Sequence, residues 1–493
     1  MAKTIMIQGT GSHVGKSVVA TGLCRALMHA GYRVAPFKAQ NMALNSFATE
    51  SGGEIGVAQA AQAEACGVTP VVEMNPVLLK PNSDTGSQVI LCGKVFGNMS
   101  VDEYMGFKPK AREVVKRALA GLKEKFDIIV IEGAGSPAEI NLRENDIANM
   151  GTAEIADSPV LLVGDIDRGG VFASLYGTFQ LLLPWEKKRV QGFIINKFRG
   201  QRSLLDSGIK ELERLCQRPV LGVLPYLHDI AIAEEDSLGL PNGNGRQYPG
   251  AALDIGVVRL PSISNFTDFD PLASEQGVKV RYIKDPSEFG APDIVILPGS
   301  KSTIHDMSFL RRTGLSEKIT SAAQTEKEVV GICGGFQMLG KKICDPDSHE
   351  SALTEIEGLG LLSVNTTIKK CKETFQVKGV ELETGISVRG YEIHMGESRG
   401  EGKPVFSLTR LGGSGPSVQD GERKGNVWGT YIHGLFENDA FRNLFLNKVR
   451  KRKGVAVSES RSIFDRGPGY DALAHKMTEN LDMAKLYSIL SLP

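Results

Sequence analysis

Short apolar runs alternate with helix-like patterns through the N-terminal part of the chain. The runs lie at residues 4–8, 32–38, 127–132, 159–165 and 192–197, and each has the length of a strand. Runs of this kind between helical patterns are typical of a parallel sheet that is covered by helices. This part of the sequence therefore predicts a three-layer α/β domain.

The alternation stops and then starts again further along the chain. Residues 234–250, EEDSLGLPNGNGRQYPG, have no apolar period and indicate an interdomain linker. Apolar runs return at 254–260, 293–297 and 329–333, so a second three-layer α/β domain is expected. Near the end, Leu473, Met477 and Leu481 are spaced by four and predict one closing helix. The predicted divisions are a domain at 1–235, a linker at 236–250, a domain at 251–450 and a C-terminal extension at 451–493.

Composition excludes several classes of protein. The chain has 493 residues, and its 57 Lys and Arg balance 57 Asp and Glu, so no overall charge favours nucleic acid or an anionic membrane. The basic run KVRKRK at 448–453 is interpreted as a solvated helix end. Seven cysteines without metal-like pairing indicate reduced thiols. Because the chain has no signal-like N-terminus and no run of about 18 apolar residues, we expect a cytoplasmic protein with no membrane or nucleic-acid partner.

The first candidate site is GTGSHVGKS at 9–17, a glycine-rich turn between a predicted strand and a predicted helix. A usual phosphate-binding loop leaves four residues before its Gly-Lys pair, whereas Gly9 leaves five and Gly11 leaves three. In this context the backbone from Gly11 to Gly15 can cradle phosphates, while Lys16 neutralises charge and the Ser17 hydroxyl is available to Mg²⁺. An ordinary glycine-rich turn is the alternative.

Two later strand ends strengthen the nucleotide interpretation. DIIVIEGAGSP ends an apolar strand at Glu132, and a carboxylate at that edge is suited to hold Mg²⁺, although it could instead cap the next turn. GFIINKF places Asn196 at another strand end, where an amide could read an adenine edge or serve a turn. We therefore expect ATP and Mg²⁺ as cofactors, with Ser17 and Glu132 as metal ligands.

The second candidate site is VVGICGGFQMLG at 329–340. Glycines flank Cys333 in a Gly-x-Cys-x-Gly elbow, which permits the strained turn that projects a nucleophile above a sheet. A small buried core cysteine is the alternative. The following helix N-terminus favours a thiolate, and the Gly334 N–H would face a developing oxyanion. The loop LPGSKST at 297–303 could supply a second donor near Gly299.

These motifs resemble known families. The loop GTGSHVGKS has the length seen in the dethiobiotin-synthetase branch of the P-loop fold, which accounts for its spacing. PFKAQNMALNS at 36–46 and GDIDRGGVFAS at 164–174 resemble blocks of the cobyric acid synthase family, the glutamine-hydrolysing amidotransferases of the cobalamin pathway. The resemblance covers nearly the whole chain in matching order. It implies an N-terminal dethiobiotin-synthetase-like domain and a C-terminal class I glutamine amidotransferase-like domain.

The resemblance also implies roles for polar residues in both blocks. Lys38 is expected to assist phosphate binding. The corrinoid or its activated carboxylate is expected to contact a polar set: Gln40, Asn41, Asn45, Ser46, Asp165, Asp167 and Arg168. An amide-rich loop suits a substrate with many amides and carboxylates, although local turns account for some of these residues. For Arg168, an internal ion pair with aspartate is an equally open alternative to a phosphate contact.

A cysteine nucleophile needs a base, and the order of the amidotransferase fold places it at His433 in WGTYIHGLFE. His394 lies in GYEIHMG, which resembles a structural or channel-lining segment of related enzymes. Many members of the fold carry Glu two residues after the histidine, whereas this chain has Leu435 there and Glu437 two further on. The orienting partner of His433 is therefore open. Gln337 resembles a residue that helps to hold glutamine.

Together the sites imply an ATP- and glutamine-dependent amidoligase whose partners are small molecules: glutamine, ATP and a corrinoid. Cys333 is expected to release ammonia through a thioester, and the ATP site is expected to form an acyl phosphate that ammonia attacks. The resemblance specifies the b, d, e and g carboxylates of adenosylcobyrinic acid a,c-diamide as acceptors. A route for ammonia between the domains is a further hypothesis.

Three alternatives remain at this stage. A cobyrinic acid a,c-diamide synthase has the same two domains, but KAQNMALNS and DIDRGGVFAS favour the first interpretation. An ATP-dependent switch of the partitioning type would leave the Cys333 elbow without a role. A γ-glutamyl hydrolase would leave Lys16 and Glu132 without a functional role.

Overall fold

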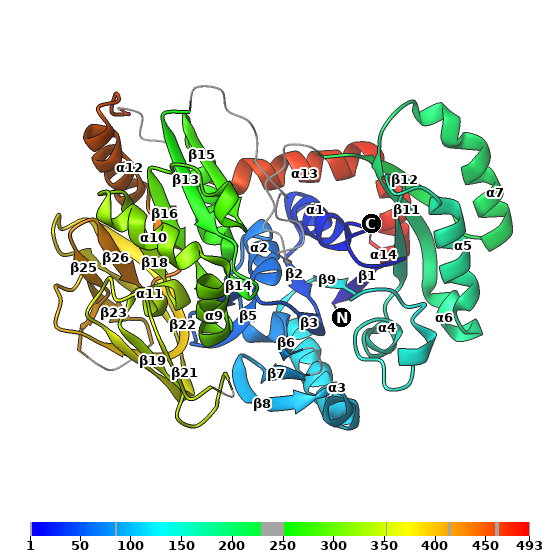
Figure 1. Cartoon of the computed structure of the whole chain (residues 1–493). Coiled ribbons are helices and arrows are strands. Elements are labelled where there is room, and N and C mark those ends of the chain that lie inside the picture. The colour runs from blue at the N-terminus through cyan, green and yellow to red at the C-terminus, as the bar shows by residue number, and fades with distance from the viewer. Residues whose placement is uncertain are drawn as a thin grey trace. The chain divides into compact units, whose positions relative to one another are not determined.

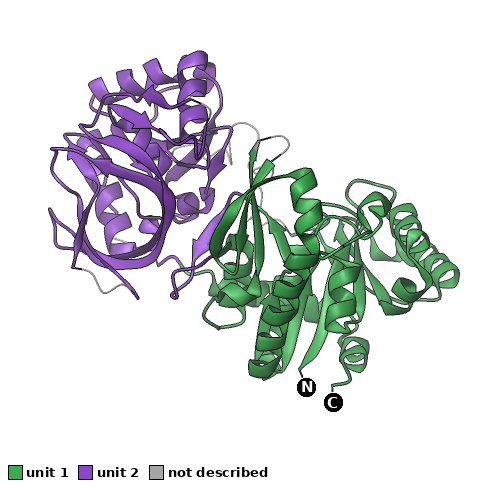
Figure 2. Ribbon diagram, turned by 90° about the horizontal axis from the view of Figure 1, so that it is seen from below, with its two compact units in different colours: residues 1–43, 55–233, 465–493 green, residues 44–54, 234–464 purple. Residues whose placement is uncertain are grey.

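The computed structural model describes residues 2–83, 86–227, 251–351, 353–412, 416–458 and 463–492. The chain divides into two compact units (Figure 2). Unit 1 consists of residues 1–43, 55–233 and 465–493, and unit 2 consists of residues 44–54 and 234–464. The predicted linker at 236–250 lies outside the described residues. Within the described ranges, no helix is both long and apolar enough to cross a membrane.

Unit 1 is built on a six-stranded parallel sheet, and Figure 1 shows it with helices on both faces. The five apolar runs of the N-terminal part coincide with five of its strands. In spatial order the strands are β12 (Val220–Pro225), β11 (Val190–Phe198), β10 (Val160–Asp165), β1 (Lys3–Gly9), β9 (Ile128–Glu132) and β2 (Val34–Phe37). The carboxyl ends of parallel strands share one edge, which is where ligands bind in such sheets.

Helices cover both faces of this sheet. Apolar side chains of one face pack against α1 (Lys16–His29), α13 (Gly467–Asn480) and α14 (Met483–Leu490). Those of the other face pack against α3 (Val101–Lys125), α4 (Met150–Ala156), α5 (Val171–Leu181) and α7 (Asp206–Cys216). The remaining elements of the unit are α2 (Val57–Ala65), α6 (Pro184–Arg189) and a four-stranded sheet of β3 (Gln40–Met42), β6 (Val77–Ser83), β7 (Gly86–Leu91) and β8 (Lys94–Ser100).

The C-terminal residues complete unit 1. The sequence predicted one closing helix, whereas the structure has two, α13 and α14, because Leu481 follows the last turn of α13 in extended conformation. Leu473 and Met477 pack so closely on α1 that a Cβ on Gly22 would lie 2.6 Å from Met477 Cγ. Residues 465–493 therefore close one face of the first sheet.

Unit 2 contains a second six-stranded sheet. Its strands are β15 (Val278–Ile283), β13 (Leu253–Val258), β16 (Ile294–Leu297), β18 (Glu328–Ile332), β26 (Val427–Thr430) and β25 (Glu422–Lys424), all parallel except the β25 edge. The helices are α8 (Asp270–Ala273), α9 (Thr303–Thr313), α10 (Leu315–Gln324), α11 (Gly334–Leu339) and α12 (Asp439–Lys453). The three apolar runs after the linker coincide with β13, β16 and β18.

Unit 2 also contains a further sheet, one short pair of strands and the inserted segment at 44–54. The sheet consists of β20 (Glu355–Glu357), β19 (Lys342–Cys344), β21 (Asn365–Glu381), β22 (Ser387–Arg399), β23 (Phe406–Arg410) and β24 (Val418–Asp420). β14 (Ile263–Ser264) pairs with β17 (Gly299–Ser300). The inserted segment at 44–54 contains β4 (Ser46–Ala48), and β5 (Glu54–Gly56) follows it.

The inserted segment is anchored inside unit 2 by Asn265. The Asn45 Oδ1 atom accepts from the Asn265 backbone N–H at 2.6 Å, and the Asn265 amide both accepts from Ser46 N at 3.2 Å and donates to Ser46 O at 2.8 Å. Asn265 has a left-handed backbone, with φ of 54°, and directly precedes the short helix η5 (Phe266–Phe269). The segment thus supports the start of η5.

Candidate functional sites

The glycine-rich turn lies at the carboxyl end of β1 and leads into α1. Gly15 has φ of 98°, and Lys16 folds back so that its Nζ donates to Gly11 O at 2.7 Å and to Gly135 O at 3.0 Å. Lys16 is therefore held over the loop by one carbonyl of the loop and one carbonyl of the turn after β9, a position that suits a phosphate-binding lysine. The structure brings Gly11, Gly15, Lys16 and Ser17 together at one edge of the sheet.

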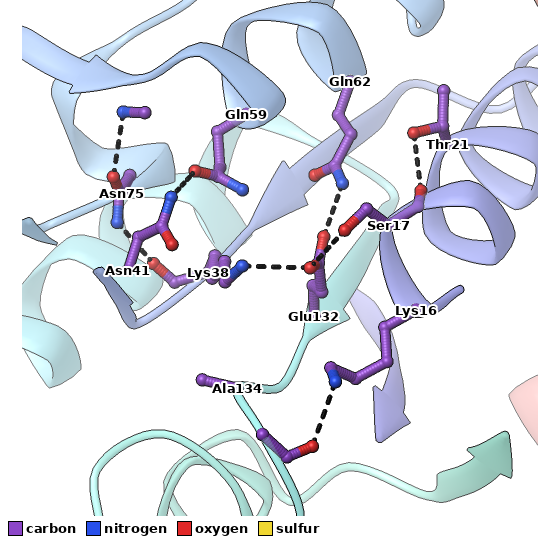
Figure 3. Close-up of polar contacts among 12 residues, drawn as sticks. Lys16, Ser17, Thr21, Lys38, Asn41, Gln59, Gln62, Asn75, Glu132 and Ala134 are labelled. Atoms are coloured by element: carbon purple, nitrogen blue, oxygen red, sulfur yellow. Dashed lines mark hydrogen bonds and ion pairs between the residues drawn. The ribbon is translucent and has the colours of Figure 1, made fainter. Parts of the chain in front are cut away.

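Glu132 is the centre of a buried polar cluster beside this turn (Figure 3). Its Oε1 accepts from Ser17 Oγ at 2.8 Å and from Lys38 Nζ at 3.0 Å. Its Oε2 accepts from Gln62 Nε2 at 2.6 Å. Burial raises the pKa of the Glu132 carboxyl, but the Lys38 charge and the hydrogen bonds outweigh burial and hold that pKa below its usual range. Glu132 is therefore a carboxylate at neutral pH.

The second signature block lies at the end of β10. Asp165 is buried and accepts from Lys197 Nζ at 2.8 Å, while Lys197 also donates to His13 O in the glycine-rich turn at 2.6 Å. Arg168 lies 3.8 Å from Asp165 Oδ2, and Arg199 pairs with Asp167 at 3.0 Å. An internal ion-pair network therefore links this block to the turn.

Asn196 also supports the turn. Its Nδ2 donates to Val14 O at 2.9 Å, and a Cβ on Gly15 would lie 2.0 Å from that same nitrogen. In this structure the amide contacts the loop backbone, and its expected contact with adenine stays a prediction.

The amide-rich loop is divided between the two units. Gln40 and Asn41 belong to unit 1, where Gln40 Oε1 accepts from Tyr104 OH at 2.7 Å and Asn41 Nδ2 donates to Gln59 Oε1 at 3.0 Å. Asn45 and Ser46 belong to unit 2. Their predicted contacts with substrate remain predictions.

Cys333 occupies the sharp turn between β18 and α11. Its φ of 52° and ψ of −108° are strained for a residue with a side chain, and its thiol lies 3.6 Å from Ile393 O. A Cβ on Gly331 would lie 2.6 Å from Phe336 N, and one on Gly335 would lie 2.0 Å from Leu297 O. The flanking glycines are therefore required for the elbow to close.

His433 follows β26 and is oriented by an aspartate. Its Nδ1 lies 2.7 Å from Asp268 Oδ2, and Asp268 Oδ1 accepts from Gly434 N at 2.9 Å. Burial alone lowers the pKa of His433, but the Asp268 carboxylate and the Cys333 contact raise it to about 10. The Cys333 thiol and the Asp268 carboxylate thus both act on His433, and the three side chains suit the roles of nucleophile, orienting carboxylate and base.

The strand β17 borders this series. A Cβ on Gly299 would lie 3.1 Å from His433 Cε1, and one on Gly334 would lie 2.8 Å from Ser300 N. The two glycines predicted to contribute oxyanion donors therefore lie beside the elbow and beside the base.

Gln337 and His394 lie on the other side of the elbow. The Gln337 amide accepts from Thr303 Oγ1 at 3.0 Å and donates to Tyr431 OH at 3.2 Å. His394 Nδ1 lies 2.8 Å from Gly396 O, and its ring stacks on Tyr431 at 3.8 Å between centroids. His433, and not His394, is the histidine that contacts both Cys333 and Asp268.

Two domain families match the chain in the order of its two sites. The CobQ/CobB/MinD/ParA nucleotide binding domain matches residues 5–240, and the CobB/CobQ-like glutamine amidotransferase domain matches residues 254–441. Cobyric acid synthase of Dehalococcoides mccartyi strain CBDB1 is 51% identical, over 100% of this chain and 99% of that protein. The cobyric acid synthase of Desulforamulus reducens is 48% identical, over 100% of this chain and 99% of that protein. The cobyric acid synthase of Yersinia enterocolitica is also 48% identical, over 99% of this chain and 98% of that protein. The chain belongs to the cobyric acid synthase family.

Membership in the cobyric acid synthase family confirms the predicted family, the fold class and the assignment as an amidoligase enzyme. The nucleotide-binding domain and the synthase family together imply that the enzyme uses ATP. The glutamine amidotransferase domain supports amidation in the cobalamin pathway.

The residues around Glu132 fit a magnesium ion. Mg²⁺ prefers oxygen ligands, and at nucleotide sites one or two protein oxygens suffice because phosphates and water complete the shell. The Ser17 hydroxyl and the Glu132 carboxylate, 2.8 Å apart, offer two such oxygens. Among the described residues, no group of three or more His, Cys, Asp or Glu side chains is arranged to hold a metal ion.

Gly15→Ala is expected to destabilise the phosphate-binding turn by about 1–3 kcal/mol and to weaken ATP binding, because φ of 98° disfavours a side chain and the new Cβ would meet Asn196 Nδ2. Thermal unfolding and ATP calorimetry measure both effects. Gly11→Ala is the control for stability, since a Cβ there meets nothing within 4 Å. Equal melting temperatures for the two variants would contradict the strain argument.

Asp268→Asn is expected to lower the glutaminase rate by about 10²- to 10⁴-fold, because the amide no longer orients His433 or stabilises its protonated form. Since Asp268 helps to raise the pKa of His433 to about 10, the substitution should also move the alkaline limb of the rate profile to lower pH. Initial rates of glutamate release across the pH range measure both changes. Asp285→Asn, at an exposed turn of unit 2, is the control. An unchanged alkaline limb would contradict the assignment.

Sequence reasoning left one functional partner unidentified. Asp268 lies 165 positions before His433, and only the tertiary fold brings them together. The available signal was the stretch NFTDFD at 265–270, a polar turn with an acid soon after a predicted strand. Leu435, which occupies the position where many members of the fold carry Glu, and Glu437 lie in a short 3-10 helix beyond the histidine.

Proposed function

We propose that this enzyme converts the b, d, e and g side-chain carboxylates of adenosylcobyrinic acid a,c-diamide into amides, giving adenosylcobyric acid. The observation that carries the proposal is the presence of two complete sets of groups in one chain. One set, Lys16, Ser17 and Glu132, suits ATP, and the other, Cys333 with His433, suits glutamine. Neither set alone accounts for the chain.

In the glutaminase step, the Cys333 thiolate attacks the side-chain carbonyl of glutamine and forms a thioester. His433 gives a proton to the departing nitrogen, and ammonia leaves. Water, deprotonated by His433, then releases glutamate. Backbone N–H groups near Gly334 and Ser300 would stabilise the oxyanion of each tetrahedral intermediate.

In the synthase step, a substrate carboxylate attacks the γ-phosphate of ATP to form an acyl phosphate and ADP. Lys16 and Lys38 would neutralise charge on the phosphates, and Ser17 and Glu132 would hold Mg²⁺. When bound, the metal ion supplies charge stabilisation to the transferred phosphoryl group. Ammonia then displaces phosphate and leaves an amide.

The test is incubation of the purified enzyme with MgATP, glutamine and adenosylcobyrinic acid a,c-diamide, followed by mass spectrometry of the corrinoid. Stepwise formation of four amides, each with one ATP and one glutamine consumed, is the expected result. Cobyrinic acid, offered in parallel, distinguishes the a,c-diamide synthase reaction. Amidation of cobyrinic acid, with no amidation of adenosylcobyrinic acid a,c-diamide, would overturn the proposal and leave an amidoligase with a different acceptor.

A further inference from the structure

Helix α2 buries two glutamines, and Figure 3 shows the Gln62 side chain directed toward Glu132 and the Gln59 side chain directed toward Asn41. Gln59 and Gln62 are 0% and 1% exposed. Their spacing of three places them on the same face of the helix, in the otherwise alanine-rich sequence VAQAAQAEA. Two buried amides on a helix of small residues are costly unless their polar atoms are used.

The orientation of the Gln62 amide is determined by its partner. Because a carboxylate only accepts hydrogen bonds, the contact with Glu132 Oε2 at 2.6 Å must come from Gln62 Nε2. The Oε1 atom therefore points elsewhere, and it is buried without a hydrogen bond to any of the described residues. Gln62 offers one unused acceptor next to the carboxylate.

In Gln59 it is the amide nitrogen, a hydrogen-bond donor, that is unused. Its Oε1 accepts from Asn41 Nδ2 at 3.0 Å, while its Nε2 is buried with no hydrogen-bond partner within the described ranges. Gly56 makes this arrangement possible, because a Cβ there would lie 2.5 Å from both atoms of the Asn41–Gln59 bond. Gln59 thus offers one unused donor, one helical turn from the acceptor of Gln62.

We propose that Gln59 and Gln62 form the subsite where ammonia meets the acyl phosphate, an inference that rests on the proposed function. Gln62 Oε1 accepts an N–H of ammonia, and Gln59 Nε2 donates to the carbonyl oxygen under attack. A donor and an acceptor on residues one helical turn apart complement a carbonyl next to a nitrogen, which is the group that the reaction creates. The bond from Gln62 to Glu132 places this subsite at the phosphate end of the nucleotide site.

The neutrality of the two amides fits this role. A carboxylate acceptor would stabilise ammonium, which has no lone pair for attack, whereas an amide oxygen binds ammonia without favouring its protonation. The nitrogen forms a bond to the acyl carbon, and the bond from that carbon to the phosphate oxygen breaks. The electron pair leaves with phosphate, which takes the proton that the nitrogen loses.

The variants Gln62→Met and Gln59→Met test the proposal in the full chain, with ammonium chloride as nitrogen source so that the glutaminase is bypassed. Glu64→Gln, exposed on the same helix, is the matched control. The readouts are amide formed, ATP hydrolysed, glutaminase rate, and hydroxamate formed when hydroxylamine traps the acyl phosphate. The substrate is adenosylcobyrinic acid a,c-diamide.

Gln62→Met should raise the KM for ammonium about tenfold, and Gln59→Met should lower kcat about tenfold, the size expected for one lost hydrogen bond in each case. Both variants should still form trappable acyl phosphate and should hydrolyse more ATP per amide than the wild type. Their glutaminase rates should be unchanged.

Two outcomes would overturn the subsite. One is amidation within twofold of wild type in both variants. The other is a rise in the KM for ATP with no change in coupling, which would mean that α2 acts only through Glu132. Failure of the proposed function is distinguishable, because the wild-type enzyme itself would then give neither amide nor hydroxamate from this corrinoid.

Discussion

Cys333→Ala is expected to abolish amidation from glutamine, while amidation from ammonium chloride continues at a rate close to that of the wild type. Cys333 supplies the only nucleophile of the proposed glutaminase step, and its loss removes covalent catalysis, a decrease on the order of 10³-fold or more. The side chains of the proposed ATP site, Lys16, Ser17 and Glu132, belong to unit 1 and are unchanged in this variant. Glutamate release and corrinoid mass, followed with each nitrogen source, measure the two activities.

Cys371→Ala, at an exposed thiol of the same unit, is the control for loss of a cysteine. Retention of glutamine-dependent activity in Cys333→Ala would assign the glutaminase to another residue. Loss of ammonium-dependent activity as well would mean that the strained elbow also supports the synthase.

Lys16→Met is the converse experiment, with a comparable effect expected at the other site. Lys16 is buried over the turn, with hydrogen bonds to Gly11 O and Gly135 O, and it is the lysine of the turn itself in the proposed phosphate site. Amide formation from either nitrogen source should fall by about 10²- to 10³-fold, as for removal of other groups that stabilise transition-state charge. Glutaminase activity, measured as glutamate release without ATP, should persist.

Lys3→Met, at an exposed position of β1, the strand before the turn, controls for loss of a lysine. If Lys16→Met retained normal amidation, the glycine-rich turn would be a structural turn, and the nucleotide would have to bind elsewhere. Equal loss of the two activities would instead indicate a general folding defect, which thermal unfolding would reveal.

The parallel sheets and the two strand-end sites could be predicted from sequence because their signals are local. Buried parallel strands are short apolar runs. The Cys333 elbow is marked by glycines, because other atoms approach these positions too closely to leave room for a Cβ. Lys16, Ser17 and Glu132 follow strands whose carboxyl ends meet at one edge. Strand order does not need to be known for that inference.

Asp268, Gln59 and Gln62 could not be assigned in the same way. Asp268 follows the left-handed residue Asn265 and reaches His433 through the tertiary fold, and the stretch NFTDFD alone does not specify which distant side chain its acid contacts. The glutamines of α2 read as a polar stripe on a helix, and their burial depends on Glu132 and Asn41. Contacts between distant segments determine both cases.

The exchange of segments between the units has a consequence for how the enzyme can be divided. A single cut between residues 233 and 251 would leave the first polypeptide without α13 and α14, exposing one face of its sheet. The second polypeptide would lack residues 44–54, and with them the partners that hold Asn265 ahead of Asp268. Each product would be missing part of its own interior. A single cut at this point is therefore not expected to yield two independently stable proteins, because each unit needs a segment that lies on the other side of the cut.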